Sequence, residues 1–278
     1  MPDLYPYSRK KQNWDRLGYL DNAPRKLLTD LRNPIDRGAL KDCEYIFHLA
    51  AMPGLSLSWQ DTKLYLDCNI LGTSNLLEAC DLSSLKKFIY ISTSSVYGKF
   101  ISGDENTPTS PISPYGVSKL AAEKMVSAYA SATKMPFTIM RPFSVYGPRQ
   151  REDMAFSIFI RKILKNEKIE IFGDGTQSRT NTFVSDLVNG LILGSQNGIP
   201  GEVYNLSGNQ EYNVIEVISI LEDLIGRKAN VTFTSERLGD QSKTYTDSAK
   251  ARREFNYSPV TTLKEGLSKQ IEWQIANP

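Results

Sequence analysis

A strand followed by a hydroxyl-rich turn decides the fold: Lys87-Phe88-Ile89-Tyr90-Ile91-Ser92-Thr93-Ser94-Ser95-Val96-Tyr97-Gly98. A short apolar run that ends in such a turn is typical of a buried strand. A hydroxyl at the carboxyl end of a strand points into the crevice where α/β sheets bind ligands. The stretch therefore predicts a strand with a ligand site at its end, although the Ser and Thr run taken alone also fits an ordinary polar turn.

Strand-length apolar runs alternate along the chain with stretches of helical period, which predicts a parallel sheet with helices on both faces. In the first half we expect strands at 26–29, 44–49, 87–92 and 137–140, and helices at 62–80 and 118–133. Beyond these lie predicted helices at 155–166, 184–193, 214–225 and 263–275, and strands at 169–172, 203–206 and 231–234. Asn213 and Glu216 have the spacing of a capping box. We predict a nucleotide-binding core over 1–143 and a mainly substrate-binding lobe over 144–278, with some strands returning to the core.

Composition excludes several classes of protein. The 278 residues include 33 basic and 31 acidic side chains, a net charge of +2 that does not indicate a nucleic-acid or anionic-membrane partner. No apolar run approaches the ~18 residues of a membrane span, and the polar N-terminal segment lacks the apolar core of a secretory signal. Three cysteines without CxxC spacing (Cys43, Cys68 and Cys80) fit a reducing compartment. We therefore expect a cytoplasmic protein.

The chain has a single histidine, His48, which excludes a His-rich zinc site and most Ser-His-Asp schemes. His48 lies inside an apolar run, so we expect a packed histidine at a strand end and no catalytic metal.

The strongest chemical signal is Tyr115-Gly116-Val117-Ser118-Lys119. Residues four apart lie on one face of a helix, which places the Lys119 ammonium near the Tyr115 phenol. A nearby positive charge favours the phenolate and lowers the pKa of the tyrosine, so that it becomes a usable base near neutral pH. The spacing is common by chance, and it gains weight from the hydroxyl run about twenty residues upstream.

Six motifs together resemble the extended short-chain dehydrogenase/reductase family of NAD-dependent epimerases and dehydratases. They are 47–51 (FHLAA), 92–98 (STSSVYG), 113–119 (SPYGVSK), 141–149 (RPFSVYGPR), 172–179 (FGDGTQSR) and 237–240 (RLGD). Their order and spacing match from about residue 28 to the end of the chain. The resemblance implies a Rossmann-like, doubly wound parallel sheet with a small C-terminal α/β lobe.

The resemblance also implies roles for individual residues. Tyr115 would be the catalytic base, Lys119 its electrostatic partner and a ligand of the NAD ribose, and Thr93 the hydroxyl that binds the sugar oxygen. Further cofactor contacts would come from Asp30, Leu31, Leu49, Ala50, Ala51, Asn69 and Phe143. Substrate contacts would come from Ser94, Ser95, Ser144, Arg179, Arg237 and Asp240, with the arginines on the diphosphate. Asn69 also fits a satisfied helix amide, Arg237 a surface arginine, and Ser144 stands where the family has asparagine.

The family opens with a strand, a GxxGxxG loop and a helix, and the 278 residues contain no GxxGxxG. By this comparison the sheet lacks its first strand, and about 30 residues of one βαβ unit are missing. The backbone amides of that loop bind the pyrophosphate of the cofactor. We therefore expect the chain as written to bind NAD weakly or not at all.

The resemblance implies 4-epimerisation of a nucleoside-diphosphate sugar, a UDP-sugar, with NAD as cofactor. Dehydratases of the family carry Asp-Glu where Ser94 and Ser95 stand, and decarboxylating relatives carry Glu at Ser95. The stretch 147–155 is most similar to UDP-glucuronate and UDP-glucose 4-epimerases. An NAD(P)H-dependent 4-ketosugar reductase would use the same residues, and a catalytically silent fragment or nucleotide-sugar-binding module is the alternative of another class. We expect a homodimer.

Overall fold

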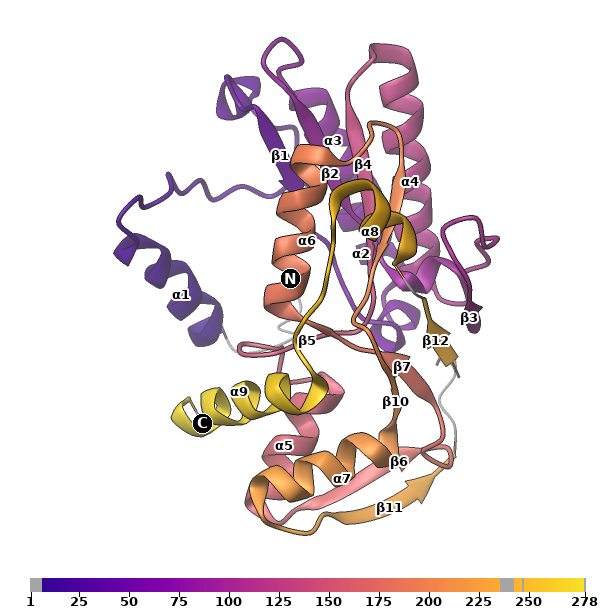
Figure 1. Cartoon of the computed structure of the whole chain (residues 1–278). Coiled ribbons are helices and arrows are strands. Elements are labelled where there is room, and N and C mark those ends of the chain that lie inside the picture. Colours follow the sequence, from indigo (N-terminus) through magenta and orange to yellow (C-terminus); the bar gives the residue numbers. More distant parts are fainter. Residues whose placement is uncertain (1–6, 236–242, 247, 278) are drawn as a thin grey trace.

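The computed structural model describes residues 7–235, 243–246 and 248–277 (Figure 1). Its main sheet has four parallel strands in the order β1 (Tyr45–His48), β2 (Lys87–Ile91), β4 (Phe137–Pro142) and β9 (Val203–Leu206). Ile89, at the centre of β2, pairs with Phe47 on one side and Thr138 on the other. This confirms the predicted α/β fold with a parallel sheet.

Helices cover both faces of this sheet. On one face, α2 (Thr62–Leu66), a π-helical turn (Asp67–Leu71) and α3 (Gly72–Ala79) form one continuous helix beside α4 (Pro114–Thr133). Leu77 and Val126 from these helices pack against Phe88 and Tyr90. On the other face, α6 (Val184–Asn197) and α8 (Ala249–Phe255) pack against Ile89 and its neighbours. Both clusters are fully apolar in their centres, so the sheet is buried as its sequence predicts.

The lower part of Figure 1 is a lobe of three helices around a two-stranded parallel sheet. The helices are α5 (Ala155–Lys165), α7 (Val214–Ile225) and α9 (Leu263–Ala276), and the strands are β6 (Lys168–Phe172) and β11 (Asn230–Thr234). Ile160, Leu221 and Leu267 form the centre of its core. The predicted capping box is present, because Asn213 and Glu216 exchange side-chain and backbone hydrogen bonds at the start of α7.

Two small sheets connect the lobe with the main sheet. One has the order β10 (Glu211–Asn213), β7 (Ser178–Thr180), β12 (Lys243–Tyr245) and β3 (Phe100–Ser102), and the other pairs β5 (Val145–Tyr146) with β8 (Thr182–Phe183). The remaining helical segments are α1 (Tyr7–Arg16) and the 3₁₀ turns Leu17–Tyr19, Arg37–Leu40, Ser56–Trp59 and Ser94–Val96. Both the main sheet and the sheet β10-β7-β12-β3 therefore contain strands from each side of residue 143.

Two sequence-based expectations differ from the structure. Residues 26–29 are not a strand: they pair with no neighbour among the described residues, and Leu28 is 90% exposed. These residues have the composition of a strand, but no neighbouring strand forms backbone hydrogen bonds with them. Helix α4 begins at Pro114, four residues before the predicted start, because Ser113 caps it and proline suits the first helical position. The earlier start places Tyr115 in the first turn.

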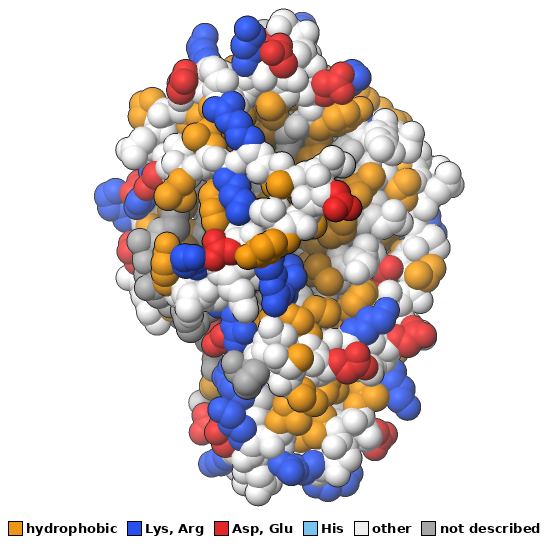
Figure 2. Space-filling model, turned by 90° about the vertical axis from the view of Figure 1, so that its left-hand side faces the viewer, with side chains coloured by type: hydrophobic (Ala, Val, Ile, Leu, Met, Phe, Trp, Pro, Cys, Tyr) orange, Lys and Arg blue, Asp and Glu red, His pale blue; other side chains and the backbone are white. Residues whose placement is uncertain are grey.

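The surface carries mixed charge. Figure 2 shows basic and acidic side chains interspersed with hydrophobic ones over the face that it displays, in agreement with the balanced composition. Of the helices that the structure describes, none is long and apolar enough to cross a membrane.

Candidate active site

The start of α4 is held directly against the hydroxyl turn that follows β2. Gly116 makes this approach possible, because a Cβ atom at this position would lie 2.7 Å from the backbone oxygen of Ser95. The Ser113 hydroxyl accepts the Gly116 N–H at 3.1 Å and fixes the first turn. Tyr115 is therefore presented to the turn by packing that no larger residue at 116 could make.

The Thr93 hydroxyl lies between this turn and the phenol of Tyr115. It accepts the Ser95 N–H at 3.1 Å and donates to the Ser95 hydroxyl at 3.2 Å. Burial raises the pKa of Tyr115, whereas a hydrogen bond with the Thr93 side chain and the charge of Arg151 act in the opposite direction. The structure thus confirms the expected proximity of Thr93 and Tyr115. Ser94 and Ser95 are as deeply buried as Thr93.

The Lys119 ammonium lies under the carboxyl end of β2. It is 3% exposed, donates to the backbone oxygen of Ile91 at 2.6 Å and lies 4.3 Å from the centre of the Tyr90 ring. Burial lowers the pKa of Lys119 to about 7, although the negative charge of Glu123 opposes this change. A lysine in this environment exchanges its proton near neutral pH and responds strongly to added charge.

Glu123 lies one further turn along α4 and acts on Lys119 through its negative charge. Glu123 also belongs to a buried ion pair. Arg141 on β4 donates to both carboxylate oxygens of Glu123, at 2.9 and 2.6 Å, and the two side chains are 5% and 2% exposed. Its remaining guanidinium arm donates to the Tyr97 hydroxyl at 2.8 Å, and Tyr97 donates to Asn205 on β9. The four-residue spacing of 115, 119 and 123 is the sequence signal for this network, because it places the three residues on one face of the helix.

Asn69 is a satisfied buried amide that positions a loop. It is 1% exposed; its oxygen accepts the Met52 N–H at 2.6 Å, and its nitrogen donates to the Met52 oxygen at 3.0 Å and to the Ser118 hydroxyl at 2.9 Å. These bonds use both its donors, so Asn69 has no N–H left for a cofactor. They hold the segment after β1, in which Leu49 is 60% exposed, Ala50 is exposed and Ala51 is half-buried.

The Phe143 ring is fully buried in a cluster with Val96, Tyr97 and Ile101. Its expected contact with the nicotinamide stays a prediction. Ser144 follows with a positive φ of 26°, a conformation that asparagine tolerates better than serine.

The predicted adenine and diphosphate residues lie apart from this centre. The Arg32 guanidinium holds the Asp30 carboxylate at 3.0 Å and lowers the pKa of Asp30 to about 2, and the Leu31 backbone oxygen accepts from Asn75 on α3. Arg179 lies half-buried on β7. Arg237 and Asp240 lie outside the described residues, so their proposed substrate contacts stay predictions.

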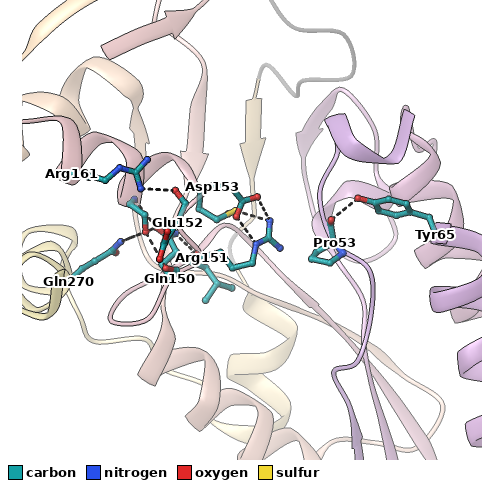
Figure 3. Close-up of polar contacts among 11 residues, drawn as sticks. Pro53, Tyr65, Gln150, Arg151, Glu152, Asp153, Arg161 and Gln270 are labelled. Atoms are coloured by element: carbon teal, nitrogen blue, oxygen red, sulfur yellow. Dashed lines mark hydrogen bonds and ion pairs between the residues drawn. The ribbon is translucent and has the colours of Figure 1, made fainter. Parts of the chain in front are cut away.

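Two residues without a predicted role flank Tyr115. The Tyr65 ring meets the Tyr115 ring edge-on at 6.2 Å, and its hydroxyl donates to the Pro53 oxygen at 2.7 Å. Arg151 donates twice to Asp153, both at 2.9 Å, and its guanidinium extends from its loop toward Pro53 and Tyr65 (Figure 3). Arg151 lies inside the stretch 147–155, but nothing in the sequence shows the direction of its side chain.

His48 is the packed histidine that its surroundings predicted. It is 2% exposed, its Nε2 lies 2.9 Å from the Thr73 hydroxyl, and burial lowers its pKa to about 3. It is therefore neutral near pH 7. In the described part of the chain, no group of three or more His, Cys, Asp or Glu residues could hold a metal ion. The site thus places Tyr115 beside the Thr93 hydroxyl, with Lys119 one helical turn further on against the end of β2. The roles of these three residues in proton transfer stay predictions.

Comparisons with known proteins extend over both parts of the chain. The model of the NAD dependent epimerase/dehydratase family matches residues 8–207. An uncharacterized UDP-glucose epimerase, YtcB of Bacillus subtilis (strain 168), is 41% identical over 276 residues, 96% of this chain and 85% of the relative. A UDP-glucuronate 4-epimerase of Thermodesulfobacterium geofontis (strain OPF15) is 36% identical over 84% of this chain and 72% of its own length. The UDP-glucuronic acid 4-epimerase of Bacillus cereus, solved with UDP-glucuronic acid and NAD, has a TM-score of 0.93 at 37% identity, covering 98% of this chain and 87% of that one.

Proposed function

Because the chain belongs to the NAD dependent epimerase/dehydratase family, we propose that its reaction is the 4-epimerisation of a UDP-sugar. The single observation that carries this proposal is the closeness of the Thr93 hydroxyl to the Tyr115 phenol, one helical turn from the buried ammonium of Lys119. This places a proton acceptor, a hydroxyl and a cation at the carboxyl end of the sheet, where α/β folds bind ligands.

The residues present fit the two nucleoside ends of NAD. Within the described residues, the Lys119 ammonium has one hydrogen-bond acceptor, the Ile91 oxygen, which leaves two N–H groups for ribose hydroxyls. Leu49 and Ala50 form an exposed apolar surface at the end of β1. Asp30 lies in the segment before β1, next to Leu31, whose backbone oxygen accepts from Asn75 on α3. The 278 residues contain no GxxGxxG, so they do not supply the usual backbone amides for the pyrophosphate.

In the proposed mechanism Tyr115 accepts the proton of the sugar 4-hydroxyl, and Lys119 stabilises the phenolate by its positive charge. Thr93 orients the phenol and binds the sugar oxygen. When bound, NAD takes up and returns the hydride at C4. Tyr115 gives its proton back to the 4-keto oxygen after the sugar has turned its other face. Ser94 and Ser95 cannot act as the acid and base that removal of water requires.

An acidic sugar, UDP-glucuronate, is the substrate that we infer. The Arg151 guanidinium extends toward Tyr65, which packs against Tyr115. Its charge acts to lower the pKa of both tyrosines, although burial dominates both values. A guanidinium in this position can bind a carboxylate with charged hydrogen bonds. The similarity to two enzymes named for UDP-glucuronate supports the same choice.

The test is Tyr115→Phe, compared with the unsubstituted protein for conversion of UDP-glucuronate to its 4-epimer at an NAD concentration high enough to saturate weak binding in both proteins. Loss of a positioned general base predicts at least ~100-fold slower turnover, with UDP-sugar affinity largely kept. Tyr65→Phe is the matched control, because it removes a hydroxyl that donates to the Pro53 backbone and leaves the ring contact with Tyr115 in place. Near-normal turnover of Tyr115→Phe refutes the assignment. In a separate assay with NADH and a UDP-4-ketosugar, oxidation of one NADH for each ketosugar reduced, without epimerisation of UDP-glucuronate in the first assay, supports the ketosugar reductase instead.

A further inference from the structure

The loop between β5 and α5, residues 147–153, carries Arg151 and is anchored by side-chain amides (Figure 3). Gln150 donates from Nε2 to the backbone oxygen of Val145 at 3.0 Å, and its Oε1 accepts the Ser157 N–H at 3.1 Å. One side chain thus ties the end of β5 to the first turn of α5 across the loop.

Gln270 on α9 anchors the same loop from 120 residues away in sequence. Its Oε1 accepts the Gly147 N–H at 2.9 Å, and its Nε2 donates to Gln150 Oε1 at 2.9 Å and to the Ser157 hydroxyl at 3.3 Å. Both ends of the loop's first turn are therefore fixed by one amide of the last helix.

Packing alone does not explain a glutamine at this position. Gln270 is 0% exposed, and its neighbours on the same helix, Leu267 and Ile271, belong to the apolar core of the lobe. A methionine would fill a similar volume without the desolvation of an amide. The main effect of a buried polar group with all its hydrogen bonds made is to fix one local geometry, and its contribution to stability is smaller.

The backbone of the loop is unusual at Arg149, which has a φ of 67°, a left-handed conformation that L-residues rarely adopt. Gly147, with a φ of 137°, adopts its conformation without strain because it has no Cβ. Arg151 follows two residues after Arg149, and Figure 3 shows its guanidinium directed toward Pro53 and Tyr65. A shift of the loop therefore moves this charge relative to Tyr115.

We propose that Gln270 is a positioning residue, which fixes residues 147–153 through Gly147 and Gln150 and so holds the Arg151 guanidinium beside Tyr115. The effect on substrate selection rests on the function proposed above. The effect on the loop does not depend on it.

The test uses amide hydrogen exchange of the whole chain, with Gln270→Met as the variant. We expect peptides covering 147–153 to exchange about 10-fold faster, and peptides of α4 to keep their rate. Gln274→Met is the matched control, since Gln274 lies one turn later on α9 and donates to the Ser157 backbone oxygen without touching the loop. If Gln270→Met does not fold, Gln150→Met breaks the same network from the half-buried side and carries the same expectation.

A second readout separates positioning from a merely structural role. With NAD present, Gln270→Met should raise the Kd for UDP-glucuronate about 10-fold, the scale of one charged hydrogen bond, and change the Kd for UDP-glucose less than ~2-fold. Unchanged exchange in 147–153, or equally faster exchange throughout the chain, overturns the proposal. So does faster loop exchange with an unchanged ratio of the two Kd values. Failure of the unsubstituted protein to bind either UDP-sugar refutes the proposed function, and the exchange experiment then decides the role of Gln270 alone.

Discussion

Replacing Glu123 by glutamine tests how strongly the network behind Lys119 is coupled to the stability of the protein. The change keeps the shape of the side chain and removes its charge. The Arg141 side chain is 5% exposed and donates two hydrogen bonds, at 2.9 and 2.6 Å, to the Glu123 carboxylate. A glutamine at position 123 would offer it one acceptor instead of two. Breaking one partner of a buried pair costs about 3–5 kcal/mol, because the remaining charge is desolvated without compensation. Since one hydrogen bond survives, we expect the lower end of that range.

The measurement is urea unfolding followed by tryptophan fluorescence and circular dichroism. With a denaturant dependence of about 3 kcal/mol per molar, a loss of about 3 kcal/mol lowers the urea midpoint by about 1 M. Glu44→Gln is the control, because its ion pair with Lys86 has side chains that are 55% and 57% exposed, and such pairs contribute less than about 1 kcal/mol. A midpoint for Glu123→Gln no lower than that of the control refutes the reasoning. The double replacement Glu123→Met with Arg141→Met should restore most of the loss, since neither charge remains buried alone.

Two further predictions concern Lys119 and NAD. Burial lowers the pKa of Lys119 from 10.5 to about 7, so the folded protein releases this proton before the unfolded chain does. Between about pH 7 and 10.5 the free energy of unfolding should therefore rise with pH, and it should rise more than in Lys119→Met. Parallel pH profiles of the two proteins contradict this prediction. For the 278 residues as written, calorimetric titration should give a Kd for NAD weaker than about 1 µM. That affinity needs about 8 kcal/mol, and each neutral hydrogen bond to the remaining contacts adds only about 1 kcal/mol; micromolar binding contradicts the expectation.

The sequence predicted the elements that depend on local pattern. Helix α7 was expected at 214–225 and occupies those residues, because its apolar period and its capping box agree. The expected helix 62–80 is present as a continuous helix with a π-helical turn that no periodicity could reveal. Residues 26–29 have strand composition but no partner strand in the described chain, and pairing is a property of the whole sheet.

The candidate site shows the same division between position and direction. The spacing of Tyr115 and Lys119 was sufficient to place both on one face of α4 beside the end of β2, and Thr93, which follows that strand, lies close to Tyr115. The catalytic roles of the three residues stay predictions. Motif position alone could not show that the Phe143 ring turns into the core or that Arg151 extends toward Tyr65. These directions depend on packing with segments distant in sequence. The homodimer, the cytoplasmic location and the division at residue 143 stay predictions.

The sharing of sheets between the two parts of the chain has a mechanical consequence. Strand β9 comes from the second part and pairs with β4 of the first, while β3 comes from the first part and pairs with β12 of the second. Each part thus contributes a strand to a sheet of the other, and the parts cannot rotate away from each other without breaking backbone hydrogen bonds in both sheets. Any change of shape that opens the carboxyl end of the main sheet must therefore be local, in single loops and side chains. A hinge rotation of one part against the other would break the pairing of β4 with β9 and of β3 with β12.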